Sequence, residues 1–326
     1  MKILACDIGA TKTETAVYGI ENKIPVLINS QKFLNVEFRS PEDIILKYLK
    51  NISFKIDCAC IGVPGPVEEG RCTGTNIKWE FSEFSLSEKF RIKKLKLVND
   101  IEAIAAAIPF YKEENLITVY KGSQSDKKRN KAIIAPGTGL GQAAMIYNEG
   151  KYITVSTEGG HTDFSPDDET EAELMFYLKK KFGHASYERV ASGSGIRNIF
   201  NFLKDIKKYE VSNILEKNLA SDDPAKVIYE QSLIGKSRIC EKTFDIFISA
   251  LGRQTGNIVL NFKATGGVYL AGGIPLKIQA MIRTEKFVNS YLRKGELSYL
   301  NAAAPVYIIS DPSAAIFGAA VTASLL

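Results

Sequence analysis

The chain has 326 residues, of which 45% are hydrophobic and 24% are charged. This composition is typical of globular proteins, and the length is enough for two domains with separate cores. The net charge is +5 and the sequence pI is 8.7, just under the value of about 9 that suggests a nucleic-acid-binding domain. The basic residues form short scattered runs without interleaved aromatic residues, so we expect no nucleic-acid partner.

The cysteines and the apolar segments indicate in which cellular compartment the protein is expected. Five cysteines occur without a C-x-x-C pair, and Cys6, Cys58 and Cys60 lie in apolar, strand-like runs. We expect them to be reduced core residues. The apolar stretches are shorter than the roughly 20 residues of a membrane helix, and the first strand is expected from residue 3, which leaves no signal peptide. These features predict a cytoplasmic protein without a membrane partner.

The first hairpin begins with the apolar run 3–6, which predicts a buried strand, and residues 15–18 predict a returning strand. We expect Gly9 in the turn to allow a positive φ and close approach to a ligand. Backbone N–H groups, hydroxyls and Lys12 can then bind phosphate oxygens. Asp7 stands at the strand end, where it can hold Mg²⁺ directly or through water. The alternative is an ordinary hairpin with a solvated tip.

A second hairpin repeats this pattern. Residues 132–135 predict a strand, 136–141 (PGTGLG) a turn, and 142–147 a returning strand. Neither the Walker A nor the Rossmann spacing occurs here, and the tripeptide GKS at 235–237 lacks the leading glycine because Glu230 occupies that position. The two hairpins together predict a duplicated α/β domain that binds one nucleotide from both sides.

The remaining segments alternate between strand and helix patterns. Ser40 is a predicted N-cap, followed by proline at the first helical position. Asp7, Asn99 and Gly137 stand at carboxyl ends of predicted strands, where ligands bind in α/β sheets. The further expected strands are 24–32, 56–63, 95–98, 268–271 and 306–310. The expected helices are 41–50, 102–108, 170–182, 195–205, 223–261 and 312–326.

Five motifs in this order resemble bacterial glucokinases: DIGAT at 7–11, VND at 98–100, GTGLG at 137–141, EGGH at 158–161 and LAGGI at 270–274. Smaller matches lie at 62–66, 75–79, 183–190, 192–195 and 256–261. Their order and spacing over nearly the whole chain carry the resemblance. No cysteine-rich zinc motif follows His161, so the resemblance is to the branch without zinc.

The resemblance implies an α/β, two-lobed actin-like ATPase (ribonuclease H-like) fold with a central cleft. The expected small domain comprises 1–109 plus 309–326, and the large domain 110–308. The implied activity is that of a hexose phosphotransferase of glycolysis, which transfers phosphate from ATP to the 6-hydroxyl of glucose. A homodimer is expected by analogy alone.

The resemblance also assigns the sugar site. Asp100 follows a strand and opens a helix, so it is the expected catalytic base, although aspartate at that place is also a common helix cap. His161 could instead be an ordinary surface or packed histidine, and Glu188 a helix-face ion pair. His184 is expected to be structural. The residues expected around the hexose are Asn99, Asp100, Glu158, His161 and Glu188.

The two hairpins predict the nucleotide side, and the resemblance implies that a glycine pair after the strand 268–271 also belongs to it. The alternative for the glycine pair is a simple turn. The expected residues are Asp7, Ile8, Gly9, Ala10, Thr11, Lys12, Gly137, Thr138, Gly139, Gly272 and Gly273. Ala10 stands where many relatives have glycine, which is tolerable if its φ stays negative. Lys12 stands where many have asparagine and adds a positive charge near the phosphates.

Two other functions remain open. The substrate could be another hexose or an amino sugar, or the donor polyphosphate. A sugar-sensing regulator or an actin-like ATPase without sugar transfer is the alternative from another class. Regulators of this superfamily carry an N-terminal helix-turn-helix, for which we expect no room before the first strand.

Overall fold

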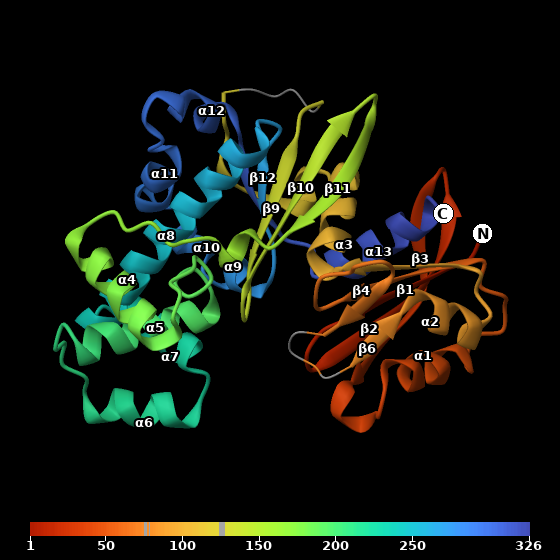
Figure 1. The fold of residues 1–326 in the computed structure, drawn as a ribbon, viewed down its shortest axis with the longest axis horizontal. Coiled ribbons are helices and arrows are strands. Elements are labelled where there is room, and N and C mark those ends of the chain that lie inside the picture. The colour runs from red at the N-terminus through yellow and green to blue at the C-terminus, as the bar shows by residue number, and fades with distance from the viewer. Residues whose placement is uncertain (75–76, 78, 124–127) are drawn as a thin grey trace. The chain divides into compact units, whose positions relative to one another are not determined.

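The computed structural model describes residues 1–74, 77, 79–123 and 128–326 (Figure 1). These form two compact units. Unit 1 contains Met1–Asn115, Thr154–Ser156 and Asp311–Leu326, and unit 2 contains Leu116–Ile153 and Thr157–Ser310.

Unit 1 extends beyond residue 109, where the sequence analysis placed the end of the first domain. The residues that follow Pro109 pack against the C-terminal segment Asp311–Leu326, which belongs to the same unit. The Tyr111 hydroxyl donates to Asp311 Oδ2 over 3.2 Å, and the Phe110 and Phe317 rings pack edge to face with centroids 6.0 Å apart.

The sheet of unit 1 has five strands in the order β3-β2-β1-β4-β7. The hairpin β1–β2 is antiparallel, whereas β1, β4 and β7 run parallel to one another. All five strands were expected from the sequence; four are longer than predicted, whereas β4 begins two residues later than predicted. Their bounds are β1 Ile3–Ile8, β2 Lys12–Glu21, β3 Ile24–Leu34, β4 Cys58–Val63 and β7 Lys94–Asn99.

Helices cover both faces of this sheet (Figure 1). One face packs Leu4, Cys6 and Ile8 against helices α1 (Pro41–Leu49) and α2 (Glu83–Phe90). The other face packs against α3 (Asp100–Ala107) and α13 (Ala314–Ser324). A Cβ at Gly318 would collide with the Ala103 carbonyl, so the small residues of α13 permit a close helix contact.

The second large sheet has six strands in the order β11-β10-β9-β12-β13-β8 and belongs to unit 2, except for Thr154–Ser156 of β11, which are grouped with unit 1. The expected hairpin β9–β10 is antiparallel, and β12 runs parallel to both β9 and β13. The two outer strands β8 and β11 were not predicted from the sequence. The strands are β8 Leu116–Tyr120, β9 Lys131–Pro136, β10 Leu140–Asn148, β11 Lys151–Thr157, β12 Val268–Leu270 and β13 Val306–Ile309.

The range 223–261, which was expected to be helical, contains two helices. Gly235 adopts φ +70° and ends α7 (Pro224–Ile234), so that α8 (Arg238–Phe262) starts afresh. The long α8 packs against α5, α7 and α11 in the core of unit 2. The other helices of this unit are α4 Glu169–Phe182, α5 Gly193–Asp205, α6 Asn213–Ser221, α9 Gly273–Lys277, α10 Gln279–Ile282, α11 Glu285–Leu292 and α12 Ser298–Ala303.

Short elements complete the chain. They are the ribbon β5 (Arg71–Thr73) and β6 (Glu80–Ser82), and the 3₁₀ turns η1 Asn35–Glu37, η2 Ile108–Phe110, η3 Glu113–Asn115, η4 Gly159–His161 and η5 Gly295–Leu297. Thr75, Asn76 and Lys78 of the matched segment 75–79, and residues 124–127 of the polar loop, lie outside the described residues.

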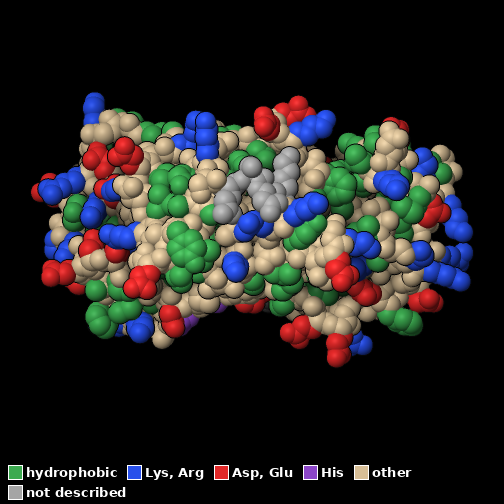
Figure 2. Space-filling view, turned by 90° about the horizontal axis from the view of Figure 1, so that it is seen from above, with side chains coloured by type: hydrophobic (Ala, Val, Ile, Leu, Met, Phe, Trp, Pro, Cys, Tyr) green, Lys and Arg blue, Asp and Glu red, His purple; other side chains and the backbone are tan. Residues whose placement is uncertain are grey.

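All five cysteines are buried and free, which includes Cys6, Cys58 and Cys60, the three predicted to be core residues. Lysines and arginines are spread among aspartates and glutamates on the face drawn in Figure 2, without forming one basic stripe there. Within the described ranges, we find no helix that is both long and apolar enough to cross a bilayer.

Candidate active site

Three polar residues of unit 1 stand at neighbouring strand ends. Asp7 of β1 pairs in register with Gly62 of β4, which pairs with Val98 of β7, and Asn99 and Asp100 follow at once. The parallel sheet therefore brings the carboxylates of Asp7 and Asp100 close enough to interact electrostatically.

Asp7 is half-buried, and among the described residues none donates a hydrogen bond to its carboxylate. Burial raises the pKa of Asp7 to about 7, the negative charges of Asp100 and Glu14 add to this rise, and Lys32 opposes it. A carboxylate that is poorly solvated and close to a second one is a good ligand for a cation.

Asn99, and not Asp100, is the N-cap of α3. Its Oδ1 accepts from the Ile101 N–H over 2.9 Å, and its Nδ2 donates to the Gly65 carbonyl over 3.2 Å. Asp100 is the first helical residue, and its Oδ1 also accepts from the Ile101 N–H over 2.9 Å. The helix N-terminus stabilises the ionised form of this aspartate.

The turn between β1 and β2 is fixed by Asn35, which the sequence analysis did not single out. The Gly9 N–H donates to the Lys12 carbonyl over 2.9 Å, and Asn35 bonds the Gly9 and Thr11 carbonyls over 2.8 and 3.0 Å. Contrary to expectation, the φ of Gly9 is not positive. Glycine is favoured there by close packing, because a Cβ would lie 3.2 Å from the Lys12 carbonyl oxygen.

The side chains around this turn differ in exposure. Thr11 and Lys12 are exposed, and so is Ala10, whose φ is not positive, as its tolerance requires. The Ile8 side chain is fully buried, so only its backbone is available to a ligand. The turn offers a ligand mainly backbone groups, one hydroxyl and one ammonium.

In unit 2, Glu188 joins two predicted binding turns. Its Oε2 accepts from the Leu140 N–H over 3.0 Å, beside the turn 137–139, and its own N–H donates to the Gly160 carbonyl over 2.8 Å. The His161 Nε2 lies 3.9 Å from the same Oε2. Among the described residues, no lysine or arginine pairs with Glu188, and the residue does not lie on a helix, so the ion-pair alternative is wrong.

The turn that holds Glu158 and His161 packs tightly against β10. A Cβ at Gly160 would collide with the Leu140 carbonyl, and one at Gly159 would lie 2.5 Å from Gln142 Oε1. The glycines thus let the 3₁₀ turn η4 approach the strand. The side chains of Glu158 and His161 are exposed beside Glu188, at a place where hydroxyl groups could be bound.

The turn 137–139 is linked to α5, since the Gly193 N–H donates to the Gly137 carbonyl over 2.8 Å. Thr138 is exposed at its tip. Gly272 adopts φ +88°, and a Cβ there would lie 3.4 Å from the Pro136 carbonyl oxygen. Parallel pairing of β9 with β12 therefore brings the glycine pair 272–273 next to this turn.

The side chain of His184 pairs with Asp163 and not with the turns described above. Its Nε2 is 2.9 Å from Asp163 Oδ1, at an exposed place. This local pair agrees with the structural role expected for it. Within the described residues, no group of three or more histidine, cysteine, aspartate or glutamate side chains could hold a metal ion.

Two polar residues that bond η4 and the neighbouring Tyr187 were not predicted as site residues from the sequence. Gln254 Nε2 donates to the Gly159 carbonyl over 3.4 Å, and Asn257 Nδ2 donates to the Tyr187 hydroxyl over 3.3 Å. Both come from α8, about 70 to 95 positions away in sequence. No spacing or local pattern signals such contacts.

Known proteins resemble the chain over nearly its full length. Residues 4–325 match the family model described as Glucokinase. The glucokinase of Colwellia psychrerythraea is 32% identical over 320 residues, which cover 97% of this chain and 94% of that one.

Solved structures agree with this match. A glucokinase from an Antarctic psychrotroph superposes with a TM-score of 0.87 at 27% identity, covering 100% of this chain and 99% of the other. A ROK family glucokinase from Streptomyces griseus, solved with glucose and AMPPNP, has a TM-score of 0.66 at 18% identity with complete coverage of both chains. The fold is therefore the actin-like ATPase fold of these sugar kinases. The chain belongs to the glucokinase family.

Proposed function

We propose that this protein transfers the γ-phosphoryl group of ATP to the 6-hydroxyl of glucose, giving glucose 6-phosphate and ADP. The observation that carries the proposal is the match to the glucokinase family over residues 4–325. The glucose and AMPPNP found with the Streptomyces griseus protein support this pair of substrates.

We propose Asn99, Asp100, Glu158, His161 and Glu188 as the sugar-binding residues. In support, Glu188 and His161 lie together in unit 2, and the remaining lone pairs of the Glu188 carboxylate can accept hydroxyl hydrogens. A site made of such acceptors rejects a sugar that lacks the matching hydroxyl, because the acceptor is then left unpaired. Specificity should follow the hydroxyl pattern more than the size of the sugar.

Asp100 is proposed as the catalytic base. Its place in the first turn of α3 fixes the carboxylate, and the helix dipole favours its negative charge. Phosphoryl transfer is largely dissociative, so the hydroxyl loses its proton late, and a base of ordinary acidity suffices. Asp100 would accept that proton as the oxygen–phosphorus bond forms.

The proposed nucleotide-binding residues are Asp7 and the turn 8–12 in unit 1, and the segments 137–139 and 272–273 in unit 2. Asp7 fits a magnesium site, directly or through water, because its half-buried carboxylate lacks a hydrogen-bond donor and lies near Asp100. When bound, Mg²⁺ would neutralise charge on the phosphate oxygens. Lys12 and the backbone N–H groups of the turns would hold the same oxygens.

The test is a coupled assay of ADP release with glucose, mannose, fructose and N-acetylglucosamine, each with ATP or polyphosphate as donor. We expect kcat/KM to be highest with glucose and ATP. A higher kcat/KM for another sugar or donor would assign the site to that substrate. ADP release that no sugar increases would favour an ATPase or a sensor.

Family membership also supports a role at the entry of glycolysis and a cytoplasmic location. A homodimer is proposed from similarity alone. Sedimentation of the purified protein would test the dimer, since a single species of 35.9 kDa would contradict it.

A further inference from the structure

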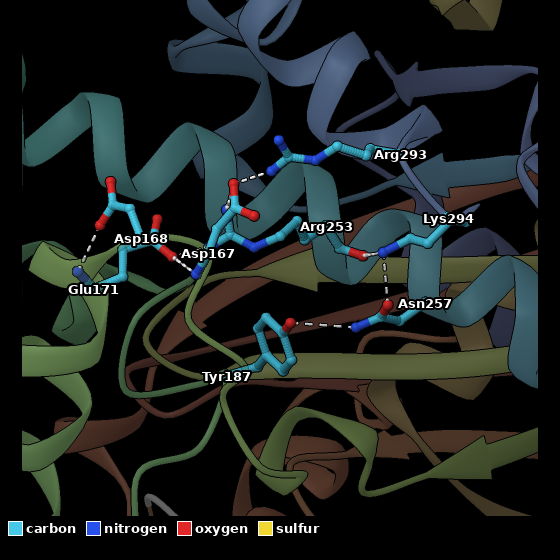
Figure 3. A network of polar contacts seen from close by, with 8 residues as sticks. All are labelled: Asp167, Asp168, Glu171, Tyr187, Arg253, Asn257, Arg293 and Lys294. Carbon is cyan, nitrogen blue, oxygen red and sulfur yellow. Dashed lines mark hydrogen bonds and ion pairs between the residues drawn. The ribbon is translucent and has the colours of Figure 1, made fainter.

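A row of hydrogen bonds starts at Lys294 and runs through Asn257 to the Tyr187 hydroxyl (Figure 3). The Lys294 Nζ donates to the Asn257 Oδ1 over 2.7 Å and to the Arg253 carbonyl over 3.1 Å. Asn257 Nδ2 donates to the Tyr187 hydroxyl over 3.3 Å and to Gln254 Oε1 over 2.9 Å. Gln254 Nε2 completes the row at the Gly159 carbonyl, 3.4 Å away.

This row has a defined direction. An ammonium group has donors only, so it turns the oxygen of the Asn257 amide toward Lys294 and the NH₂ group away. That NH₂ group requires an acceptor from Gln254, so the Gln254 oxygen faces Asn257 and its NH₂ group faces the Gly159 carbonyl. Lys294 thereby fixes the orientation of both amides.

Charged residues anchor the start of the row. Arg253 is buried, and its Nη2 lies 2.5 Å from Glu171 Oε2, while its Nη1 lies 3.7 Å from Asp167 Oδ2. Arg293 pairs with the same Asp167, as Figure 3 shows. Helix α8 and the segment around Lys294 are therefore held firmly at this end.

The row ends on the backbone that carries the sugar-binding residues. Tyr187 directly precedes Glu188 in the chain, and its ring is buried edge-on against Phe164. The N–H groups of Tyr187 and Glu188 bond the Thr162 and Gly160 carbonyls over 3.0 and 2.8 Å. The row therefore contacts both of the paired segments. It contacts the segment of Glu188 at the Tyr187 hydroxyl, and the segment of Glu158 and His161 at the Gly159 carbonyl.

We propose that Asn257 and Lys294 are positioning residues for glucose binding, which set the distance between Glu188 and the turn of Glu158 and His161. The inference rests on the proposed function of that site. Neither residue is proposed to contact the sugar. Their effect is transmitted through Tyr187 and Gln254.

The decisive variant is Asn257→Asp. It keeps the size of the side chain and the acceptor for Lys294, but it removes both donors and puts a carboxylate against Gln254 Oε1. We expect the KM for glucose to rise about tenfold, the range of one or two lost hydrogen bonds. The KM for ATP and the melting temperature should stay close to the wild-type values.

Two further variants test the direction of the row. Tyr187→Phe removes only the hydroxyl, and a rise of about threefold in the glucose KM is expected for one lost hydrogen bond. Lys294→Met removes the donor that orients Asn257, and it should raise the glucose KM as Asn257→Asp does.

Asn130→Asp is the matched control. Asn130 is half-buried, and its side-chain amide also donates to a carbonyl of α8, since its Nδ2 lies 2.9 Å from the Phe262 oxygen. This amide makes no bond to the turns that carry Glu158, His161 and Glu188. Its glucose KM should equal that of the wild type. An unchanged glucose KM in Asn257→Asp, or an equal rise in Asn130→Asp, would overturn the proposal. Failure of the proposed function would show separately, as wild-type protein without glucose-dependent ADP release.

Discussion

The two units position their proposed site residues by different means. In unit 1, Asp7, Asn99 and Asp100 stand at the ends of parallel strands, so the register of the sheet sets their positions. In unit 2, Glu188 and His161 lie on irregular turns, which are held by side-chain and backbone hydrogen bonds from distant segments.

This difference predicts different responses to substitution. A change in unit 1 should alter the chemistry of the replaced group and leave its neighbours in place. A change beneath the turns of unit 2 should act at a distance, because the turns have no regular ladder of their own. Four substitutions test this contrast.

The largest effect is expected in unit 1. Asp100→Asn removes the proposed base at constant size, and kcat should fall by about 10²–10⁴-fold, the usual contribution of a general base. Glucose binding measured by calorimetry should persist in weakened form. Asp43→Asn, an exposed residue in the first turn of α1, serves as the control and should turn over normally. Near-normal kcat in Asp100→Asn would refute the assignment.

The buried ion pair of unit 2 should dominate its stability. Burial raises the pKa of Glu171, and Arg253 opposes this rise. Arg253→Met leaves the carboxylate uncompensated and should lower the free energy of unfolding by about 3–5 kcal/mol at neutral pH. The loss should shrink as the pH falls, because Glu171 can then take up a proton. Denaturant melts at pH 5 and pH 8 would show this, and a pH-independent loss would contradict it.

A smaller effect is expected from the close approach of η4 to β10. In Gly160→Ala the added methyl group meets the Leu140 carbonyl, so the turn must shift at a cost of about 1–3 kcal/mol. The glucose KM should rise with this shift. Gly137→Ala, where a Cβ meets no atom within 4 Å, is the control for stability alone. Equal melting temperatures of the two variants would argue against the tight packing.

The smallest effect concerns the charge of Lys294. Burial, with the neighbouring Arg253 and Arg293, lowers the pKa of Lys294 from 10.5 to about 8, and Asp167 opposes this shift. Between these two values the unfolded chain binds more protons, so the stability from this group rises with pH above about 8. The cost of burying the charge is fully present below that pH.

From pH 7.5 to 9 we expect the wild type to gain about 1 kcal/mol relative to Lys294→Met, since one pKa unit corresponds to about 1.4 kcal/mol. Urea melts of both proteins at each pH measure the difference between their free energies of unfolding. Groups that titrate alike in both proteins contribute equally to each and cancel in this difference. A difference that stays constant or falls with pH would contradict the shifted pKa.

Much of unit 1 could be predicted from the sequence, because apolar runs of four to eight residues followed by polar side chains fix both a strand and its end. The N-cap at Ser40 is confirmed by its bond from the Asp43 N–H at 3.3 Å. At Asp100 the motif alone left the capping role open, and the structure gives that role to Asn99.

Less of unit 2 was predictable. The strand β11 (KYITVST) is half-exposed along its length, and its strand signal comes from β-branched and aromatic residues and not from a continuous apolar run. Gly235 and the polar residues after it mark the break between α7 and α8, but the helical pattern continues on both sides. The contacts of Asn257 with Tyr187 and Lys294 join segments that only tertiary packing brings together.

The most direct test of the account is the stoichiometry of the wild-type reaction, with ADP and glucose 6-phosphate measured in the same samples, with and without glucose. We expect one glucose 6-phosphate for each ADP, and almost no ADP when glucose is left out. ADP that forms at the same rate without glucose, or without matching glucose 6-phosphate, would contradict the proposed transfer.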